Sequence, residues 1–419
     1  MTTDTGDPRT RWFDLDEARL DLAQRAHRFV EERVRRYQRL YPDAEWSAPE
    51  SRVPWELLDD LDGTGLRTLG LPGEAGGSGP VDTLTYVVVA EELARGESAL
   101  IDIVLQGWKV GSIVATHAGA EVRRLWLGRF AAEPRLLFSH CSSEPQGSSD
   151  RWLNHDVPEA AMRTTAVRDG SGWVINGRKQ FITNGPDSSL YVVYATTTPG
   201  VVPSQGTSSF LVPRDTPGFT IGETYEKTGG RLFNNAELIF ENCRVTDDHL
   251  LILDGASGTS GRTFPASKAI IAAQAVGLAQ AAYEAAADFA ISRVQGGRPI
   301  IQHQAVALRL AEMATRIEAA RALVRQAAVA IDRKASHRRP LAYMAKVAAG
   351  ETAFEVARQA VELHGGLGVM RHAGVERLLR DATLFFHLDG TNDIHRFRII
   401  KDLFPESAGA YAERRDDVG

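Results

Sequence analysis

Two stretches rich in glycine and serine contain the residue types that hold anionic groups in proteins. The first, Ser143-Glu-Pro-Gln-Gly-Ser-Ser-Asp150, could offer backbone N–H groups and hydroxyls to phosphate oxygens, and a simple capped turn is the alternative interpretation. The second, Gly365-Gly-Leu-Gly368, would let another group approach the backbone closely at a helix end. It lacks the strand and the G-x-G-x-x-G spacing of a dinucleotide fingerprint. Both stretches therefore indicate that the protein binds a ligand, but they do not identify that ligand.

A third stretch combines an aromatic ring with a hydroxyl. Phe181 could stack on a flat ligand ring and Thr183 could hydrogen-bond to its edge, or both could be ordinary strand residues. The guanidinium of Arg293 suits a pyrophosphate, although a solvated helix arginine fits the sequence equally well. The C-terminal third also holds four histidines without the spacing of metal ligands, so we expect no metal. These histidines are His364, His372, His387 and His395.

The elements that must position these residues fall into three regions. Apolar residues at helical spacing predict a helical N-terminal domain over residues 1–135. Its expected helices lie at residues 14–39, 53–61, 82–93 and 101–118, with a glycine-rich loop at 70–79.

The pattern changes near Arg135. Short β-branched or aromatic runs separated by turn residues predict an antiparallel β domain over residues 136–250, and Asn176-Gly177 predicts a hairpin turn within it. Long Ala-rich helices then predict a four-helix bundle over residues 262–404. The expected fold is therefore α+β and multidomain, with a β domain between two helical ones.

Composition narrows the classes of function. The chain has 419 residues, 43% of them hydrophobic and 24% charged, and a net charge of -6, which argues against nucleic acid as the main partner. Its longest apolar stretches, such as 269–279, are too short to span a bilayer, so no membrane partner is expected. Two cysteines exclude a disulfide scaffold. Residues 1–13 lack an apolar signal core, so we expect a cytoplasmic protein.

Four motifs in order resemble the acyl-CoA dehydrogenase family. Each is short, but the ordered set is highly specific, and the similarity covers roughly residues 15–404. The motifs are Ser143–Asp150, Asn176-Gly-Arg-Lys-Gln-Phe-Ile-Thr-Asn-Gly185, Glu226-Lys-Thr-Gly-Gly-Arg231 with Phe240–Val245, and His364–Gly368 with Asp389-Gly-Thr-Asn-Asp-Ile-His-Arg396.

The resemblance implies FAD-dependent α,β-dehydrogenation of an acyl thioester linked to CoA or to a carrier protein. Such a reaction needs a carboxylate at Cα, and the run His387-Leu-Asp-Gly-Thr391 matches the family's segment for the catalytic base. Asp389 is therefore the predicted base, one methylene shorter than the usual Glu, with Leu388 in place of Tyr. We expect the apolar neighbour Leu388 and the exclusion of water by bound substrate to raise its pKa, because burial disfavours the charged form.

The resemblance also implies the remaining site residues. Cofactor contacts are expected at Ser143, Ser149, Phe181, Ile182, Thr183, Arg293, Gln304, Glu362, Gly365, Gly366, Thr391 and Asp393, and substrate contacts at Ser149, Lys268, Leu388 and Gly390. Arg293 and Gln304 match residues that bind FAD across a subunit interface, so a homodimer or homotetramer is expected.

Several alternatives stay open at this point. Lys268 either attracts a charged carrier group or an unusual acyl tail, or is a solvated helix lysine. The electron acceptor is an electron-transfer flavoprotein or O₂. An Asp base is also found in related nitroalkane oxidases, so an oxidase of a non-thioester or specialised substrate is the alternative function.

Overall fold

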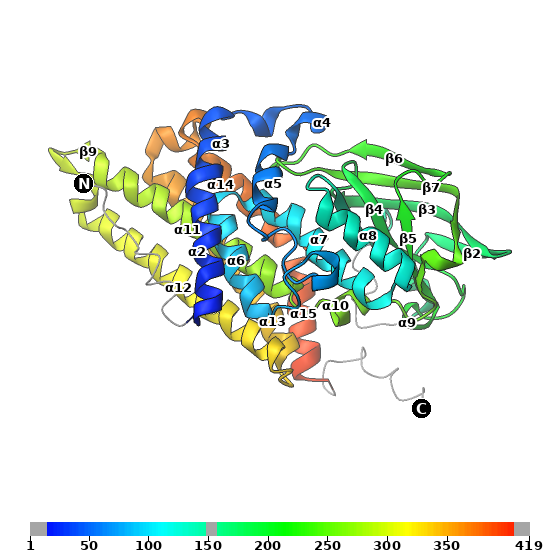
Figure 1. Ribbon diagram of the computed structural model, residues 1–419. Coiled ribbons are helices and arrows are strands. Elements are labelled where there is room, and N and C mark those ends of the chain that lie inside the picture. The colour runs from blue at the N-terminus through cyan, green and yellow to red at the C-terminus, as the bar shows by residue number, and fades with distance from the viewer. Residues whose placement is uncertain (1–14, 148–156, 406–419) are drawn as a thin grey trace.

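The computed structural model describes residues 15–147 and 157–405, in which a β domain lies at one side of a mainly helical body (Figure 1). The N-terminal helices α6 and α7 are almost completely buried, and α7 packs against both the β domain and the long helix α11. The helices of this domain are α2 Glu17–Phe29, α3 Arg35–Leu40, α4 Pro49–Arg52, α5 Trp55–Asp62, α6 Thr83–Gly96, α7 Ser98–His117 and α8 Ala120–Ala132.

Helix α7 is long and apolar enough to cross a membrane by length and composition, with a mean hydropathy of 1.3 over 18 residues. In the folded chain 83% of that window is buried, as in the core helix of a globular domain. Among the described residues no other helix meets the same criteria.

The middle domain is an eight-stranded sheet in the order β6-β7-β3-β2-β4-β5-β8, with β1 pairing with β4. Most pairs are antiparallel, whereas β1 and β2 run parallel to β4. The strands are β1 Leu137–Cys141, β2 Thr165–Asp169, β3 Gly172–Thr183, β4 Ser188–Thr196, β5 Thr207–Pro213, β6 Phe219–Thr224, β7 Asn235–Thr246 and β8 Leu250–Ile252. The short helix α9 Pro203–Gly206 precedes β5.

The predicted hairpin turn at Asn176-Gly177 is wrong. Both residues lie inside β3, where the register with β7 shifts between Ile175 and Gly177. Gly177 has φ 144°, and a Cβ there would lie 2.6 Å from the Thr164 Cα, so this position suits glycine. The Asn176 side chain accepts a hydrogen bond from the Asn242 N–H at 2.8 Å. The Asn-Gly pair therefore forms an irregularity within a paired strand and no turn.

Long Ala-rich helices build the C-terminal domain. Gly277 permits α11 to approach α6 closely, because a Cβ there would lie 2.2 Å from the Glu91 carbonyl oxygen. The helices are α10 Thr259–Thr263, α11 Ser267–Ser292, α12 Gln304–Asp332, α13 Arg338–Leu363, α14 Val375–Ala382 and α15 Asn392–Leu403, with a small β9 Val294–Gln295, β10 Arg298–Pro299 hairpin after α11.

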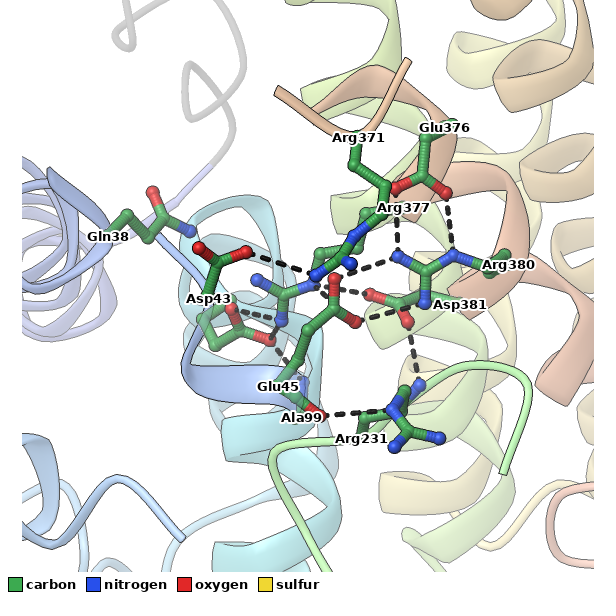
Figure 2. Close-up of polar contacts among 12 residues, drawn as sticks. Gln38, Asp43, Glu45, Ala99, Arg231, Arg371, Glu376, Arg377, Arg380 and Asp381 are labelled. Carbon is green, nitrogen blue, oxygen red and sulfur yellow. Dashed lines mark hydrogen bonds and ion pairs between the residues drawn. The ribbon is translucent and has the colours of Figure 1, made fainter. Parts of the chain in front are cut away.

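A charged cluster joins the three domains (Figure 2). Arg380 of α14 donates to the Glu45 carboxylate at 2.8 Å and to the Thr228 carbonyl at 3.0 Å. The Asp381 carboxylate accepts from the Gly230 N–H at 2.6 Å. Because Glu45 belongs to the N-terminal domain and Thr228 and Gly230 to the β6–β7 loop, α14 is tied to both other domains.

Candidate active site

Asp389 lies just before α15, at the point where three elements meet. Its backbone has φ 51°, which is unusual for a residue with a side chain. Its Oδ2 accepts from the Ser267 hydroxyl at 2.7 Å and lies 2.5 Å from Lys268 Nζ, both at the start of α11. Its Oδ1 lies 3.9 Å from Lys109 Nζ on α7. The predicted base therefore faces two lysines.

In the folded chain the pKa of Asp389 shifts downward, opposite to the rise expected with substrate bound. Burial alone would raise the pKa, but Lys109 and Lys268 together with the Ser267 hydroxyl outweigh it and hold the pKa well below its usual range. Asp389 is consequently ionised at neutral pH. The apolar neighbour Leu388, which is half-buried against the main core, does not determine the charge state.

The solvated alternative for Lys268 is also wrong. Its side chain is only 15% exposed and forms an ion pair with Asp389. Burial lowers the pKa of Lys268 to about 8, although Asp389 opposes the shift, and repulsion from Lys109 adds to it. Lys268 is therefore a partner of the predicted base.

These shifts predict that anaerobic flavin reduction becomes faster as the pH rises through about 8. Above this pH Lys268 is neutral, so Asp389 loses its nearest positive charge and becomes a stronger base. Lys268→Arg stays charged and should abolish the rise. Stopped-flow measurement between pH 6.5 and about 9 tests this, and a rise that persists in Lys268→Arg would contradict it. Burial lowers the pKa of Lys346 to about 7, so Lys346 loses its proton at a lower pH than Lys268 does.

Lys346 of α13 holds the segment that carries the predicted base. Its Nζ donates to the carbonyls of Phe385 and Gly390 and to the Asn392 side chain, each at 2.8 Å. Neither Lys346 nor Lys109 was predicted from sequence. The signal for Lys109 was a lysine in the middle of the most apolar helix of the N-terminal domain.

The end of β3 carries the predicted flavin contacts. Phe181 is 56% exposed, with φ 57°, and its ring packs on Tyr225 with centroids 4.9 Å apart. The Thr183 hydroxyl accepts from Asn235 Nδ2 at 3.2 Å, and Asn235 Oδ1 accepts from Lys227 Nζ at 2.7 Å. An exposed ring beside an oriented hydroxyl fits a flat cofactor. The Ile182 side chain is buried in the sheet core, so only its backbone can contact one.

Helix α7 contacts both the residue that follows β3 and the predicted base. Asn184, directly after Thr183, donates its side-chain amide to the Ile103 carbonyl of α7 at 3.1 Å. Lys109, which faces Asp389, lies six residues further along α7, or about 9 Å at 1.5 Å per residue. The segment that follows the predicted flavin contacts and the predicted base therefore both contact α7.

A buried ion pair anchors the hydroxyl-rich loop. Glu144 is 4% exposed and accepts from Lys179 Nζ at 2.7 Å and from the N–H groups of Arg163 and Thr164 at 2.7 and 3.0 Å. The Ser143 carbonyl accepts from the Gln180 N–H at 3.0 Å, which fixes the loop to β3. Ser149 lies outside the described residues.

A second group of predicted cofactor residues gathers at the far end of the bundle. Stacking of Phe289 on His364, with centroids 4.2 Å apart, brings the end of α11 to the end of α13. Arg309 of α12 lies 3.6 Å from Glu362 of α13, and both are about half-exposed. This end therefore collects Arg293, Gln304, Glu362, Gly365 and Gly366, of which Gly365 has φ 59°.

The structure does not bring this group to Phe181 within one chain. The β9–β10 hairpin that follows Arg293 projects from the side of the molecule opposite the β domain (Figure 1). Thr391 and Asp393 lie at the start of α15, where the Thr391 hydroxyl caps the helix by accepting from the Ile394 N–H at 3.2 Å. Asp393 is 83% exposed and pairs with Arg396.

A cavity of about 440 Å³ opens beside the C-terminal end of α7. His117 and Thr263 face each other on its wall, with Nε2 and Oγ1 2.9 Å apart. Thr116 lies seven residues beyond Lys109, about 10 Å along the helix.

Among the residues that the structure describes, no group of three or more His, Cys, Asp or Glu side chains is placed to hold a metal ion.

Comparison with known proteins identifies the class. Three family models match in order: the acyl-CoA dehydrogenase N-terminal domain over residues 16–134, the middle domain over 139–243 and the C-terminal domain over 258–404. An acyl-CoA dehydrogenase of Bacillus subtilis (strain 168) is 36% identical over 366 residues, which cover 86% of this chain and 93% of the relative.

Solved structures agree with this class. Butyryl-CoA dehydrogenase from Megasphaera elsdenii matches with a TM-score of 0.82 and 28% identity, over 93% of this chain and 99% of that one. A prolyl acyl carrier protein oxidase matches with a TM-score of 0.81 and 26% identity, over 93% and 100%. The chain therefore belongs to the acyl-CoA dehydrogenase family, as its motifs indicated, and is an FAD-dependent oxidoreductase of that family. The predicted fold class is confirmed.

Proposed function

We propose that this protein desaturates an acyl thioester between Cα and Cβ, with Asp389 as the base. The observation that supports the proposal is a partly buried, ionised carboxylate that faces Lys109 of α7, the helix that also contacts Asn184 just after β3. The Cα–H bond breaks with its proton going to Asp389, and the Cβ–H bond breaks with its hydrogen and electron pair going to the cofactor. A Cα–Cβ double bond forms, and a separate acceptor later reoxidises the cofactor.

Oδ1 of Asp389 is the oxygen that takes the proton. Oδ2 is occupied by Ser267 and Lys268, whereas Oδ1 accepts no hydrogen bond from any described residue and lies 3.9 Å from Lys109 Nζ. Substrate that enters beside Oδ1 also displaces water, which strengthens the electrostatic interactions of the site. The low pKa makes Asp389 a weak base before substrate binds, so the positions of the two lysines tune its strength.

FAD fits the residues at the end of β3, where an exposed Phe181 ring lies beside the oriented Thr183 hydroxyl. Bound FAD would supply the two-electron acceptor. Phe181 would stack on its ring system and Thr183 would donate a hydrogen bond to the ring edge. The Ser143 loop, held by the Glu144–Lys179 pair, would close the same site.

A second copy of the chain would complete the FAD site. The β9–β10 hairpin, which follows Arg293, lies on the side opposite the β domain (Figure 1). Large apolar side chains near the end of α11, the start of α12 and the end of α13 remain exposed. Such exposure marks an interaction surface. These residues are Val294, Leu308, Leu367, Val369 and Met370, between 43% and 66% exposed. We propose a homodimer or homotetramer in which Arg293 of one copy binds the FAD pyrophosphate of another.

Arg293→Ala should weaken FAD retention roughly ten- to hundredfold, which is the loss of a charge-assisted hydrogen bond. Arg293 is exposed and caps α11 only through its backbone, so the fold should not change. Equilibrium dialysis of FAD measures retention, and circular dichroism measures the fold. Arg316→Ala, which removes an exposed arginine from α12, is the matched control. Equal FAD affinity in the two variants would contradict the role of Arg293.

Anaerobic addition of acyl-CoA and acyl carrier protein thioesters to the purified protein tests the proposal. The flavin absorbance should bleach, and the product should have lost two hydrogens by mass. Relatives named for a CoA thioester and for a carrier-protein thioester motivate both carriers. Rapid bleaching by nitroalkanes, with none by thioesters, would favour the oxidase alternative.

A further inference from the structure

Lys109 is a buried cation on an apolar helix. It lies within α7, whose most apolar window is 83% buried, and its own side chain is 9% exposed. An ammonium removed from water is costly unless an anion or strong acceptors compensate it. The groups around Lys109 therefore have to supply an anion or hydrogen-bond acceptors.

The charges around Lys109 do not balance. Asp389 is the only described partner of Lys109, and Lys268 already holds that carboxylate at 2.5 Å. One carboxylate thus faces two ammonium groups, which repel each other. Lys346 adds a third cation nearby, but its hydrogen bonds to Phe385, Gly390 and Asn392 satisfy it.

Unlike Lys346, Lys109 donates no hydrogen bond to any described residue. At 3.9 Å, Asp389 Oδ1 is too far to accept a hydrogen bond from Lys109, and no other residue in the described parts of the chain accepts one. The nearly buried ammonium of Lys109 therefore faces Asp389 and has no hydrogen-bond acceptor among the described residues. A ligand with an acid group would supply both the missing charge and the missing acceptors.

We propose that Lys109 binds a carboxylate carried by the acyl group, so that the enzyme acts on short dicarboxylic acyl thioesters. This inference rests on the proposed function. Reacting atoms approach to about 3–3.5 Å and a charged hydrogen bond spans about 2.7–2.9 Å. With Lys109 and Asp389 only 3.9 Å apart, the acid group lies within a few carbons of the carbon from which Asp389 takes the proton. A four- or five-carbon dicarboxylic chain has that reach.

A role on the thioester oxygen is the competing explanation for Lys109. In that position the ammonium would serve every acyl thioester alike, because all share the same carbonyl. A carboxylate-binding lysine instead discriminates between acyl groups, since a neutral chain leaves the ammonium buried without its partner. The ratio of two substrates therefore separates the explanations.

The test uses the FAD-loaded enzyme with glutaryl-CoA and pentanoyl-CoA, which have the same chain length and differ in the terminal acid. Anaerobic stopped-flow gives the flavin-reduction rate constant divided by the substrate Kd for each. We expect glutaryl-CoA to be preferred roughly ten- to hundredfold, the value of a charged hydrogen bond. In Lys109→Met the ratio should fall to about unity, mainly through the Kd of glutaryl-CoA.

Two further variants complete the test. Lys109→Arg keeps the charge and should retain most of the preference. Lys334→Met removes an exposed lysine from the turn after α12 and should retain all of it. Equal use of both thioesters by the wild type, or an equal loss on both in Lys109→Met, overturns the inference while desaturation stands. Absence of flavin reduction by any thioester overturns the proposed function and the inference together.

Discussion

Asp389→Asn should slow flavin reduction by an acyl thioester by about 100-fold or more, the lower range for loss of a general base. The amide keeps the size of the side chain and can still accept from Ser267, but it cannot take the proton from Cα. Stopped-flow reduction under anaerobic conditions measures the loss. Asp402→Asn, which removes a carboxylate from the same helix α15 away from the two lysines, is the control.

The same substitution should also lower stability, because it leaves Lys109 and Lys268 without their shared counter-charge. The double variant Asp389→Asn, Lys109→Met removes one of these charges and should recover part of the stability while remaining slow. Recovery of the rate in the double variant, or wild-type reduction in Asp389→Asn, would show that the base lies elsewhere.

Lys179→Met should lower the free energy of unfolding by about 3–5 kcal/mol, the usual effect of breaking a buried ion pair. Lys179 is fully buried, and its partner Glu144 would remain as an uncompensated charge inside the β domain. Glu144 also anchors the Arg163–Thr164 backbone, so FAD retention should fall with stability. Urea denaturation of the FAD-loaded protein measures the change.

A double variant tests the physical cause. In Lys179→Met, Glu144→Gln the buried charge is absent, so part of the lost stability should return. If the double variant is less stable than the wild type by the sum of the two single effects, the ion pair is not the source. Lys334→Met, which removes an exposed lysine from the turn after α12, should change stability by less than about 0.5 kcal/mol.

The helices were predictable because their apolar spacing is a local property of the sequence. The buried helices α6 and α7 lie close to the expected helices at 82–93 and 101–118, and α11 lies within the expected bundle at 262–404. The Asn176-Gly177 error has a tertiary cause: pairing of β3 with β7 and close contact with Thr164 keep that dipeptide within the strand. Local turn preference could not reveal those neighbours.

The chemistry of Asp389 was predictable only in part. Its motif indicated the position, but its charge depends on Lys109 and Lys268, which reach it from helices far away in the sequence. Burial was anticipated and the compensating cations were not, so the direction of the pKa shift was reversed. The division of the cofactor residues between the two ends of the molecule likewise emerges only when α11, α12 and α13 are packed together.

Anaerobic titration of the yellow protein with acyl thioesters tests the central claim most directly. The visible flavin absorbance should be lost on addition of a thioester to the wild type, with an α,β-unsaturated thioester as product, and should persist over the same interval in Asp389→Asn. Retention of the full flavin absorbance by the wild type with every CoA and carrier-protein thioester would contradict the account.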